Sequence, residues 1–246
     1  MKESEKYLYD TLGYLYIEDA IPPDLLTEIN KMVDRYQENI KPEDQANNTI
    51  DTILNKEPLL LNLIDSPVTL PYIVEMVDQP RLKSTWITIT WQGHGTGFHS
   101  NHSPTCTHNH YSYNNGIFNN LFQVFYALED IDEDCGALTI LPGSHKSNLP
   151  IPAHDEIKDK LVKIPMKAGS VLLFSHDIYH GSLNTREDFV RRVLVFTYCP
   201  GCIANSYEGG DTLYDDLHAA SAEGSWHRFL LRRPHGFQLT EPRPSL

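Results

Sequence analysis

The chain has 246 residues, of which 40% are hydrophobic and 22% are charged, the usage of a folded globular protein rather than a disordered one. Its formal net charge of −13 repels phosphate backbones and anionic lipid surfaces, which excludes nucleic acid and membranes as preferred partners and favours a small molecule. The N-terminal sequence lacks the apolar core of a signal peptide, and no run of about 18 apolar residues occurs, so we expect a cytoplasmic protein.

Helices are predicted first along the chain. Apolar residues recur at helical spacing after the Pro22-Pro23 pair, which predicts an amphipathic helix over residues 23–40. Ser66 followed by Pro67 is typical of an N-cap with proline at the first helical position. The helix that follows would carry one apolar face, made of Leu70, Ile73, Val74 and Val77.

From about residue 82 the hydrophobic period changes from 3.6 to 2, which is the period of strands. Strands are predicted within 84–92, 120–128, 136–141, 170–175 and 190–198, separated by turn residues and without intervening helices. This order predicts a mostly β protein, an antiparallel sandwich or barrel rather than a parallel α/β fold. We expect a single domain over residues 1–246, with a helical part over 1–80, a β core over 82–200 and an extension over 201–246 that holds a short helix within 211–220.

Four cysteines are too few for a disulfide framework in a chain of this length. Cys199 and Cys202 match the C-x-x-C pattern, but neither a second pair nor a helix start accompanies them. We therefore expect inert thiols at a turn that ends a strand.

Histidines are concentrated in one acid-free region. Five of the twelve lie within residues 94–110, and residues 79–128 contain no Asp or Glu. Such a stretch is either a sheet interior that excludes carboxylates or a pocket lined by neutral imidazoles and amides. If residues 108–110 are extended, His108 and His110 point to the same side and suit adjacent corners of one metal. Imidazole binds iron, zinc, copper and nickel alike, so the spacing does not name the ion, and structural histidines are the alternative.

Two later segments carry the most informative motifs. Residues 121–146 contain a strand, an acidic turn, a second strand and then Leu141-Pro-Gly-Ser-His-Lys146, in which Gly143 suits the positive φ of a type II turn. Residues 168–198 contain a strand, the step His180-Gly-Ser182, an open loop and a strand that bears Arg191 and Arg192.

These segments resemble the phytanoyl-CoA dioxygenase family of iron(II)- and 2-oxoglutarate-dependent oxygenases. The opening GYLYIEDAIPPDLLTEI is similar to the N-terminal strand and helix of that family, so the resemblance covers most of residues 12–200. It implies a double-stranded β-helix (jelly-roll) core with N-terminal helices packed outside. It also implies that His180 is the late iron ligand, that Arg191, eleven residues later, pairs with the distal carboxylate of 2-oxoglutarate, and that Ser182 supports the same carboxylate.

The family's early His-x-Asp motif is not present in that form. Counting back from residues 125–132 places it near His108, but residue 110 is His. Four alternatives follow: His110 is a ligand, the amide of Asn101 or Asn109 is, a remote acid is, or the corner is vacant for halide, although a small residue usually accompanies such a vacancy. The segment His99-Ser-Asn101 and His102 are rival positions for the motif. We take His108, His110 and His180 as the expected metal ligands.

Strand alternation separates the two arginines. Arg191 shares a face with Val193 and Val195, whereas Arg192 points to the opposite face. Only one of them can face the interior, and the family spacing selects Arg191 for it. Gln123 shares a strand face with Phe125, and if that face is the inner one its amide can contact substrate or cosubstrate.

The sequence therefore predicts an Fe(II)- and 2-oxoglutarate-dependent dioxygenase that uses O2 to oxidise, and most simply to hydroxylate, a small organic substrate. The alternatives are the same scaffold with halogenation, desaturation or cyclisation as the outcome, and a non-catalytic metal- or ligand-binding jelly roll. His176 beside Asp177 is either a support for the metal site or a capped turn, and His145 is expected to be structural.

Overall fold

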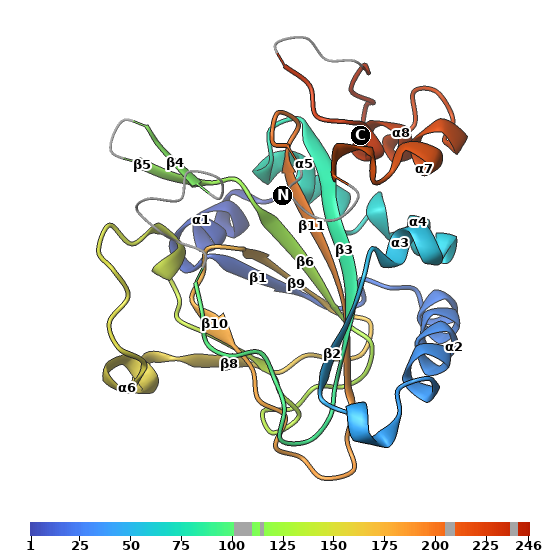
Figure 1. Ribbon diagram of the computed structural model, residues 1–246. Helices are drawn as coiled ribbons and strands as arrows, with labels where there is room; N and C mark the ends of the chain where they lie inside the picture. The colour runs from blue at the N-terminus through green and yellow to red at the C-terminus, as the bar shows by residue number, and fades with distance from the viewer. Residues whose placement is uncertain (101–109, 114–115, 205–209, 237–240) are drawn as a thin grey trace.

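The structure is a computed structural model that describes residues 1–100, 110–113, 116–204, 210–236 and 241–246, with the backbone alone described at 110–113 and 116–117. Figure 1 shows a long twisted sheet with α2, α3 and α4 on one side and β8 and β10 on the other. No helix among these residues has the length and apolar content that crossing a bilayer would require.

The first elements are α1 (Glu3–Leu12), β1 (Tyr14–Ile17) and α2 (Pro23–Glu38). Gly13 ends α1 with a φ of +86°, a left-handed conformation that glycine adopts without steric cost, and its N–H donates to the carbonyl of Tyr9. Helix α2 has proline in its first turn and buries Ile29, Met32 and Val33, as its apolar spacing predicted.

Short helices join this part to the sheet: η1 (Pro42–Asp44), α3 (Ile53–Lys56), η2 (Pro58–Leu60), α4 (Leu61–Ile64) and α5 (Leu70–Met76). The expected cap of α5 is displaced, because Thr69 rather than Ser66 is its N-cap residue. Ser66 and Pro67 instead form a separate turn, in which the carbonyl of Ser66 accepts from the N–H of Leu70 at 2.8 Å.

The six-stranded sheet has the order β1-β9-β6-β11-β3-β2, and all neighbours are antiparallel. Besides β1, its strands are β2 (Asn47–Asp51), β3 (Pro80–Thr90), β6 (Phe122–Ala127), β9 (Val171–Ser175) and β11 (Arg191–Pro200). Four of them match predicted strands. Strand β2 was not predicted, because its sequence NNTID is almost entirely polar.

A second sheet has the order β10-β7-β8, from β7 (Leu138–Ile140), β8 (Val162–Ile164) and β10 (His180–Gly181). Residues 93–99 run antiparallel to residues 180–184 through backbone hydrogen bonds, including a reciprocal pair of 2.9 Å between His99 and His180. Strands β4 (His110–Tyr113) and β5 (Gly116–Asn119) form a separate two-stranded sheet. The turn before η3 (Ser144–Lys146) contains Gly143 at a φ of +79°, as predicted.

Two apolar clusters lie on opposite faces of the large sheet. The first packs helices against the outward side chains of the strands, such as Val124 and Leu194, and the second lies between the two sheets and includes Phe125, Ile140 and Val195. The predicted mostly β, double-stranded β-helix architecture is confirmed. The second cluster leaves polar residues at one end of the space between the sheets, where the candidate site is found.

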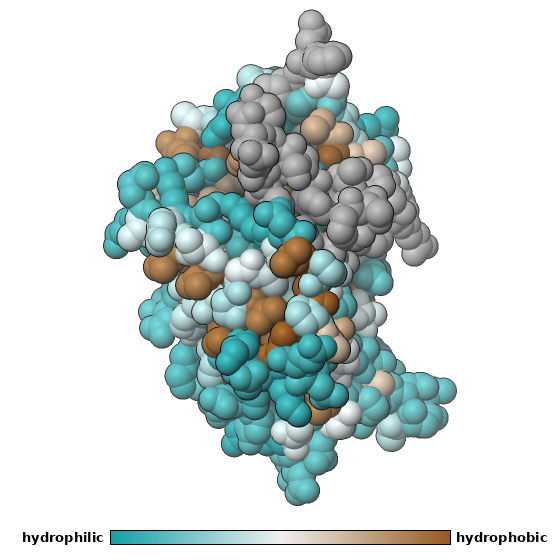
Figure 2. All heavy atoms as spheres, turned by 90° about the vertical axis from the view of Figure 1, so that its left-hand side faces the viewer, coloured by the Kyte–Doolittle hydropathy of each residue, from teal (hydrophilic) through white to brown (hydrophobic). Residues whose placement is uncertain are grey.

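The connection after the Pro-Gly turn contains α6 (His154–Ile157) and η4 (Lys158–Lys160). Figure 2, which faces the side of β8 and α6, shows apolar side chains in the middle of this face with polar ones around them. Leu149 and Leu183 are 74% and 54% exposed.

The extension contains η5 (Gly210–Thr212), α7 (Asp215–Ala220) and α8 (Trp226–Leu231). The predicted helix within 211–220 is shorter than expected, and α8 was not predicted. Two buried arginines tie this part to β3: Arg232 donates to the carbonyl of Pro80 at 2.8 Å, and Arg81 donates to that of Ile203 at 2.9 Å. Backbone carbonyls thus accept hydrogen bonds from both guanidinium groups, although Nε of Arg232 has no partner among the described residues.

Candidate active site

A pocket of about 240 Å³ lies at the polar end of the space between the sheets. The inward face of the large sheet supplies most of its wall, because every second residue of β2, β3, β6 and β11 points there. The residues after β9 and those of the bridged segments 93–99 and 180–184 close the other side. Its lining includes Asn47, Thr49, Trp86, Thr88, Thr96, His99, Gln123, Phe125, His176, His180, Ser182 and Arg191.

His99 and His180 form a pair of imidazoles in this pocket, with ring centroids 4.3 Å apart. His180 Nδ1 lies 2.8 Å from the carbonyl oxygen of Ile178, and His99 Nδ1 lies 2.8 Å from that of Gly97. A carbonyl accepts only from an N–H, so each neutral ring carries its proton on Nδ1 and leaves the Nε2 lone pair free. Metal-binding histidines in proteins are oriented in this way.

The two rings differ in exposure. His180 is 7% exposed, whereas His99 is exposed and lies on the open side. Burial and, to a lesser extent, the neighbouring His99 lower the pKa of His180 to about 4, against an opposing effect of the hydrogen bond to the Ile178 carbonyl. Burial likewise lowers the pKa of His176 to about 3. Both imidazoles are therefore neutral at physiological pH, the form that can bind a metal.

Arg191 brings the positive charge of the pocket. It is 2% exposed, and its guanidinium donates to the carbonyl of Gly136 at 2.6 Å and to the hydroxyl of Thr90 at 3.2 Å. Its Nε has no hydrogen-bond partner among the described residues, and no described carboxylate lies within ion-pair distance. Burial lowers the pKa of Arg191 to about 10, so it remains charged. An unpaired buried guanidinium is costly, and an anionic ligand would offset that cost.

Ser182 and Gln123 line the same pocket and are 5% and 4% exposed. The Ser182 hydroxyl accepts from the N–H of Thr96 at 3.2 Å, which fixes it beside the bridged segment. This approach requires glycine at position 95, because a Cβ there would lie 2.0 Å from the carbonyl oxygen of Ser182. The face of Gln123 and Phe125 is the inner one.

The structure brings together His180, Arg191, Ser182 and Gln123, four of the six residues expected at the site. His108 and the side chain of His110 lie outside the described residues, although the backbone of His110 pairs with Asn119 in the β4–β5 sheet. The imidazole beside His180 is that of His99, one of the rival positions. The sequence feature that could have pointed to His99 is Asn101, two residues later, because asparagine is the residue closest in shape to the Asp of His-x-Asp.

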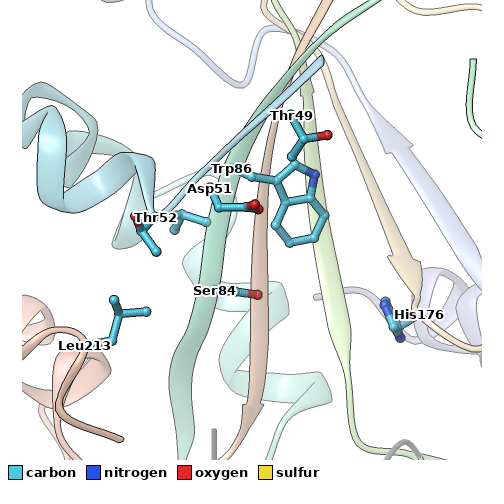
Figure 3. A pocket seen from close by; sticks show the side chains of 8 residues that line it. Thr49, Asp51, Thr52, Ser84, Trp86, His176 and Leu213 are labelled. Atoms are coloured by element: carbon cyan, nitrogen blue, oxygen red, sulfur yellow. The ribbon is translucent and has the colours of Figure 1, made fainter. Parts of the chain in front are cut away.

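A second cavity, of about 330 Å³, adjoins the first and shares Thr49, Trp86 and His176 with it. Its remaining walls come from the end of β2, the middle of β3 and the extension. In Figure 3, Asp51 and Trp86 lie side by side from β2 and β3, with Ser84 below them and His176 on the other side of the cavity. The complete described lining is Thr49, Asp51, Thr52, Ser84, Thr85, Trp86, His176 and Leu213.

Other groups with metal- or thiol-type chemistry lie apart from this site. Asp132, Asp134 and Cys135 place their ligand atoms within 4.8 Å of one another, but Arg186 reaches Asp132 at 3.2 Å and so already neutralises part of the cluster. Cys199 is buried, and burial raises the pKa of its thiol to about 11, the opposite of a reactive thiol.

A double-stranded β-helix with an oriented histidine pair and a buried, unpaired arginine between its sheets has the form of the non-haem iron oxygenase fold. The model of the family Phytanoyl-CoA dioxygenase (PhyH) matches residues 9–193. The chain belongs to this family, as its motifs indicated.

Two curated relatives are fungal dioxygenases. Dioxygenase hkm4 of Aspergillus hancockii is 37% identical over 94 residues, 38% of this chain and 30% of that protein. Dioxygenase FUM3 of Gibberella moniliformis is 36% identical over 78 residues, 32% of this chain and 25% of that protein. The matched segments thus span less than a third of either relative.

Solved structures share the fold at low sequence identity. HygX from Streptomyces hygroscopicus, with nickel, 2-oxoglutarate and hygromycin B bound, has a TM-score of 0.68 at 18% identity, over 81% of this chain and 88% of that one. The epimerase SnoN from nogalamycin biosynthesis has a TM-score of 0.67 at 18% identity, over 96% and 98%. EctD from S. alaskensis, with 2-oxoglutarate and 5-hydroxyectoine, has a TM-score of 0.65 at 16% identity, over 84% and 78%.

Proposed function

We propose that the chain is an Fe(II)- and 2-oxoglutarate-dependent dioxygenase that uses O2 to oxidise a small organic substrate, with hydroxylation as the outcome. The observation that carries the proposal is the pairing of two features within one pocket. Two imidazoles with free Nε2 atoms lie together, and an arginine without a carboxylate partner is buried in the same space. A metal and an anion would complement these features.

The donor set fits iron. His99 and His180 would hold the metal through Nε2, since their Nδ1 atoms are oriented by backbone carbonyls. An iron centre of this kind, when bound, supplies the activation of O2, and it needs free coordination positions that a small protein ligand set leaves open. The third protein ligand is the point at which this chain departs from its family, because residue 101 is Asn rather than Asp.

Arg191 would bind the distal carboxylate of 2-oxoglutarate. A guanidinium grips a carboxylate through two parallel hydrogen bonds, a geometry that lysine does not offer. Ser182 and Gln123 line the same pocket and would position the cosubstrate by hydrogen bonds. Carbonyl and hydroxyl contacts hold the guanidinium in place before the ligand arrives, so little side-chain entropy is lost on binding.

Replacing a carboxylate ligand by a neutral donor leaves the metal centre one unit more positive. The hold on anionic 2-oxoglutarate becomes stronger, and turnover is expected to be slow. The same substitution favours a second candidate, a jelly roll that binds metal and ligand without catalysis. Halogenation, desaturation and ring closure are further outcomes on this scaffold, and one fold neighbour is named as an epimerase.

The test begins with anaerobic reconstitution with Fe(II). We expect about one bound iron, saturable 2-oxoglutarate binding by calorimetry, and succinate release on admission of air. His180→Ala should lose iron, and Arg191→Ala should keep iron but lose 2-oxoglutarate. Binding of both without succinate, with a substrate panel present, would identify the non-catalytic candidate. Binding of neither would refute the oxygenase proposal.

A further inference from the structure

The second cavity has the position of a substrate chamber. It adjoins the pocket of His99, His180 and Arg191 and shares Thr49, Trp86 and His176 with it. The metal and 2-oxoglutarate would occupy the inner pocket, so the adjoining 330 Å³ is left for the molecule to be oxidised. The inference below therefore rests on the proposed function.

The described lining of this chamber contains one acidic residue, Asp51, and no lysine or arginine. Its one histidine, His176, stays neutral because burial lowers the pKa of its imidazole to about 3. The Asp51 carboxylate makes no ion pair with a described residue; Lys56 donates instead to the Asp51 backbone carbonyl, at 2.8 Å. An anionic substrate would meet this carboxylate and the net charge of −13.

The indole of Trp86 stands directly beside this carboxylate. Asp51 and Trp86 are opposite residues of β2 and β3 on the same sheet face, and Trp86 is only partly buried. Figure 3 shows both side chains at the same cavity. A cation attracted by the carboxylate would also be attracted by the face of the indole, and tryptophan is the aromatic side chain best suited to this contact.

The residue after Asp51 has a strained backbone conformation. Thr52 has a φ of +55°, which is an outlier for a β-branched residue. Strain of this kind persists where surrounding contacts hold it, and it is enriched at ligand sites. Hydroxyl-bearing residues of the chamber lining, Thr49, Thr52 and Ser84, offer polar contacts to a ligand.

We propose that this chamber binds substrates that carry a protonated amine on an apolar, ring-bearing body. Asp51 acts as the counter-ion of the ammonium group, and Trp86 provides the surface on which the ring or the cation packs. The hydroxyl groups of the chamber then bind the polar substituents of the substrate. Carboxylates and phosphate-bearing thioesters are disfavoured.

The test uses three probes of similar size and different charge: 3-phenylpropylammonium, 3-phenylpropan-1-ol and 3-phenylpropanoate. Their binding to the protein loaded with Ni(II) and 2-oxoglutarate is measured by calorimetry. Because Asp51 is exposed, we expect the ammonium probe to bind roughly three- to thirtyfold more tightly than the alcohol, the range for one exposed ion pair together with one cation–π contact, and the carboxylate to bind most weakly. Asp51→Asn should reduce the preference for the cation and leave the affinity for the alcohol unchanged.

Two further variants separate charge from packing. Trp86→Leu should weaken both the ammonium and the alcohol probes, and the ammonium probe more, because the cation also loses its contact with the indole face. Glu38→Gln removes one exposed acid on α2, outside the chamber lining, and should change nothing. Thermal denaturation of each variant shows that the fold is retained.

Equal affinity for the three probes, tighter binding of the carboxylate, a preference unaffected by Asp51→Asn, or no binding of any probe would each overturn the inference. Its failure is distinguishable from failure of the proposed function. Binding of 2-oxoglutarate to the Ni(II) protein is measured first, without a probe, and the probes are also titrated into metal-free protein. A cation preference that depends on Asp51 there would support the chamber even if 2-oxoglutarate failed to bind.

Discussion

Arg191 and Arg192 are neighbours in the chain and lie on opposite faces of β11. Arg192 points to the helix-covered face, where it donates to Glu129 at 2.9 Å and also pairs with Asp34 of α2. Arg191 points between the sheets, where backbone and hydroxyl groups hold it and no described carboxylate pairs with it. The positive charge of Arg192 is thus neutralised by carboxylates on one face, whereas that of Arg191 has no described carboxylate partner on the other.

The two faces of β11 therefore have different roles, one in stability and the other in ligand binding. The outer face resembles an ordinary core, in which charges are paired and apolar residues meet helices. The inner face carries a charged guanidinium, which is costly to bury without an anionic partner, and it faces two oriented imidazoles across the pocket. Changes on the inner face should therefore alter ligand binding, and changes on the outer face should alter stability.

The largest effect is expected from the histidine pair. His99→Ala and His180→Ala should each weaken Fe(II) binding by roughly a hundredfold or more, since a few ligands share the whole binding energy of the ion. Iron content after dialysis measures the loss. His110→Ala serves as the comparison, because it tests whether the other expected ligand contributes. A His99→Ala protein with wild-type iron content would exclude His99 as a ligand.

Substitution of Arg191 should affect ligand binding, and substitution of Arg192 should affect stability. Arg191→Leu should weaken 2-oxoglutarate binding by about a hundredfold, the loss of a buried charge pair of roughly 3 kcal/mol, while the fold stays intact or gains stability. Arg192→Leu leaves Glu129 buried without its cation and should lower the free energy of unfolding by about 1–3 kcal/mol, with 2-oxoglutarate affinity unchanged. Calorimetry and urea unfolding of both variants provide the data. Equal effects of the two changes on 2-oxoglutarate affinity would contradict the assignment of ligand binding to the inner face alone.

Asn101→Asp should strengthen metal binding in the pocket. The change restores the carboxylate of the family motif, two residues after His99, and we expect Fe(II) affinity to rise roughly tenfold, the size of other ligand-tuning effects. Asn109→Asp, which places an acid elsewhere in the same segment, is the matched control. Equal gains from both variants would show that added negative charge, and not the motif position, is responsible.

The smallest effect concerns a pair on the outer side. His227 of α8 lies with Nε2 2.9 Å from Asp65, and this hydrogen bond raises the pKa of His227. A raised pKa in the folded state means that the contribution is fully present below the unfolded pKa of about 6.5 and is lost as pH rises through the folded value. The stability difference between wild type and His227→Gln, measured by urea unfolding, should be at most about 1 kcal/mol at pH 5.5 and smaller at pH 8.5. No pH dependence of that difference would contradict the pairing.

The sequence predicted the parts of the fold whose patterns are local. Helix α2 and strands β3, β6, β9 and β11 follow from apolar periodicity, and the placement of Arg191 follows from alternation along one strand. Strand β2 and helix α8 were missed. The first is polar because it lies at the sheet edge and lines the pocket, and the second is a short helix of six residues whose apolar side chains pack on the rest of the chain.

The candidate site was predicted only where its residues lie close together in the sequence. His180, Ser182 and Arg191 lie within one continuous motif, so the spacing located them. The partner imidazole comes from a segment that meets His180 only when the second sheet closes, and sequence distance from residue 125 did not show which histidine of five would arrive there. The three-dimensional structure was needed to identify His99 as the histidine beside His180.

The reciprocal backbone bonds between His99 and His180 are made by peptide groups, so they do not depend on which side chains these positions carry. A descendant that exchanged either imidazole for another side chain would keep the same hydrogen-bonded backbone, and so the same shape, while its chemistry was lost. The scaffold is accordingly well suited to give rise to relatives that bind small molecules and no longer transform them.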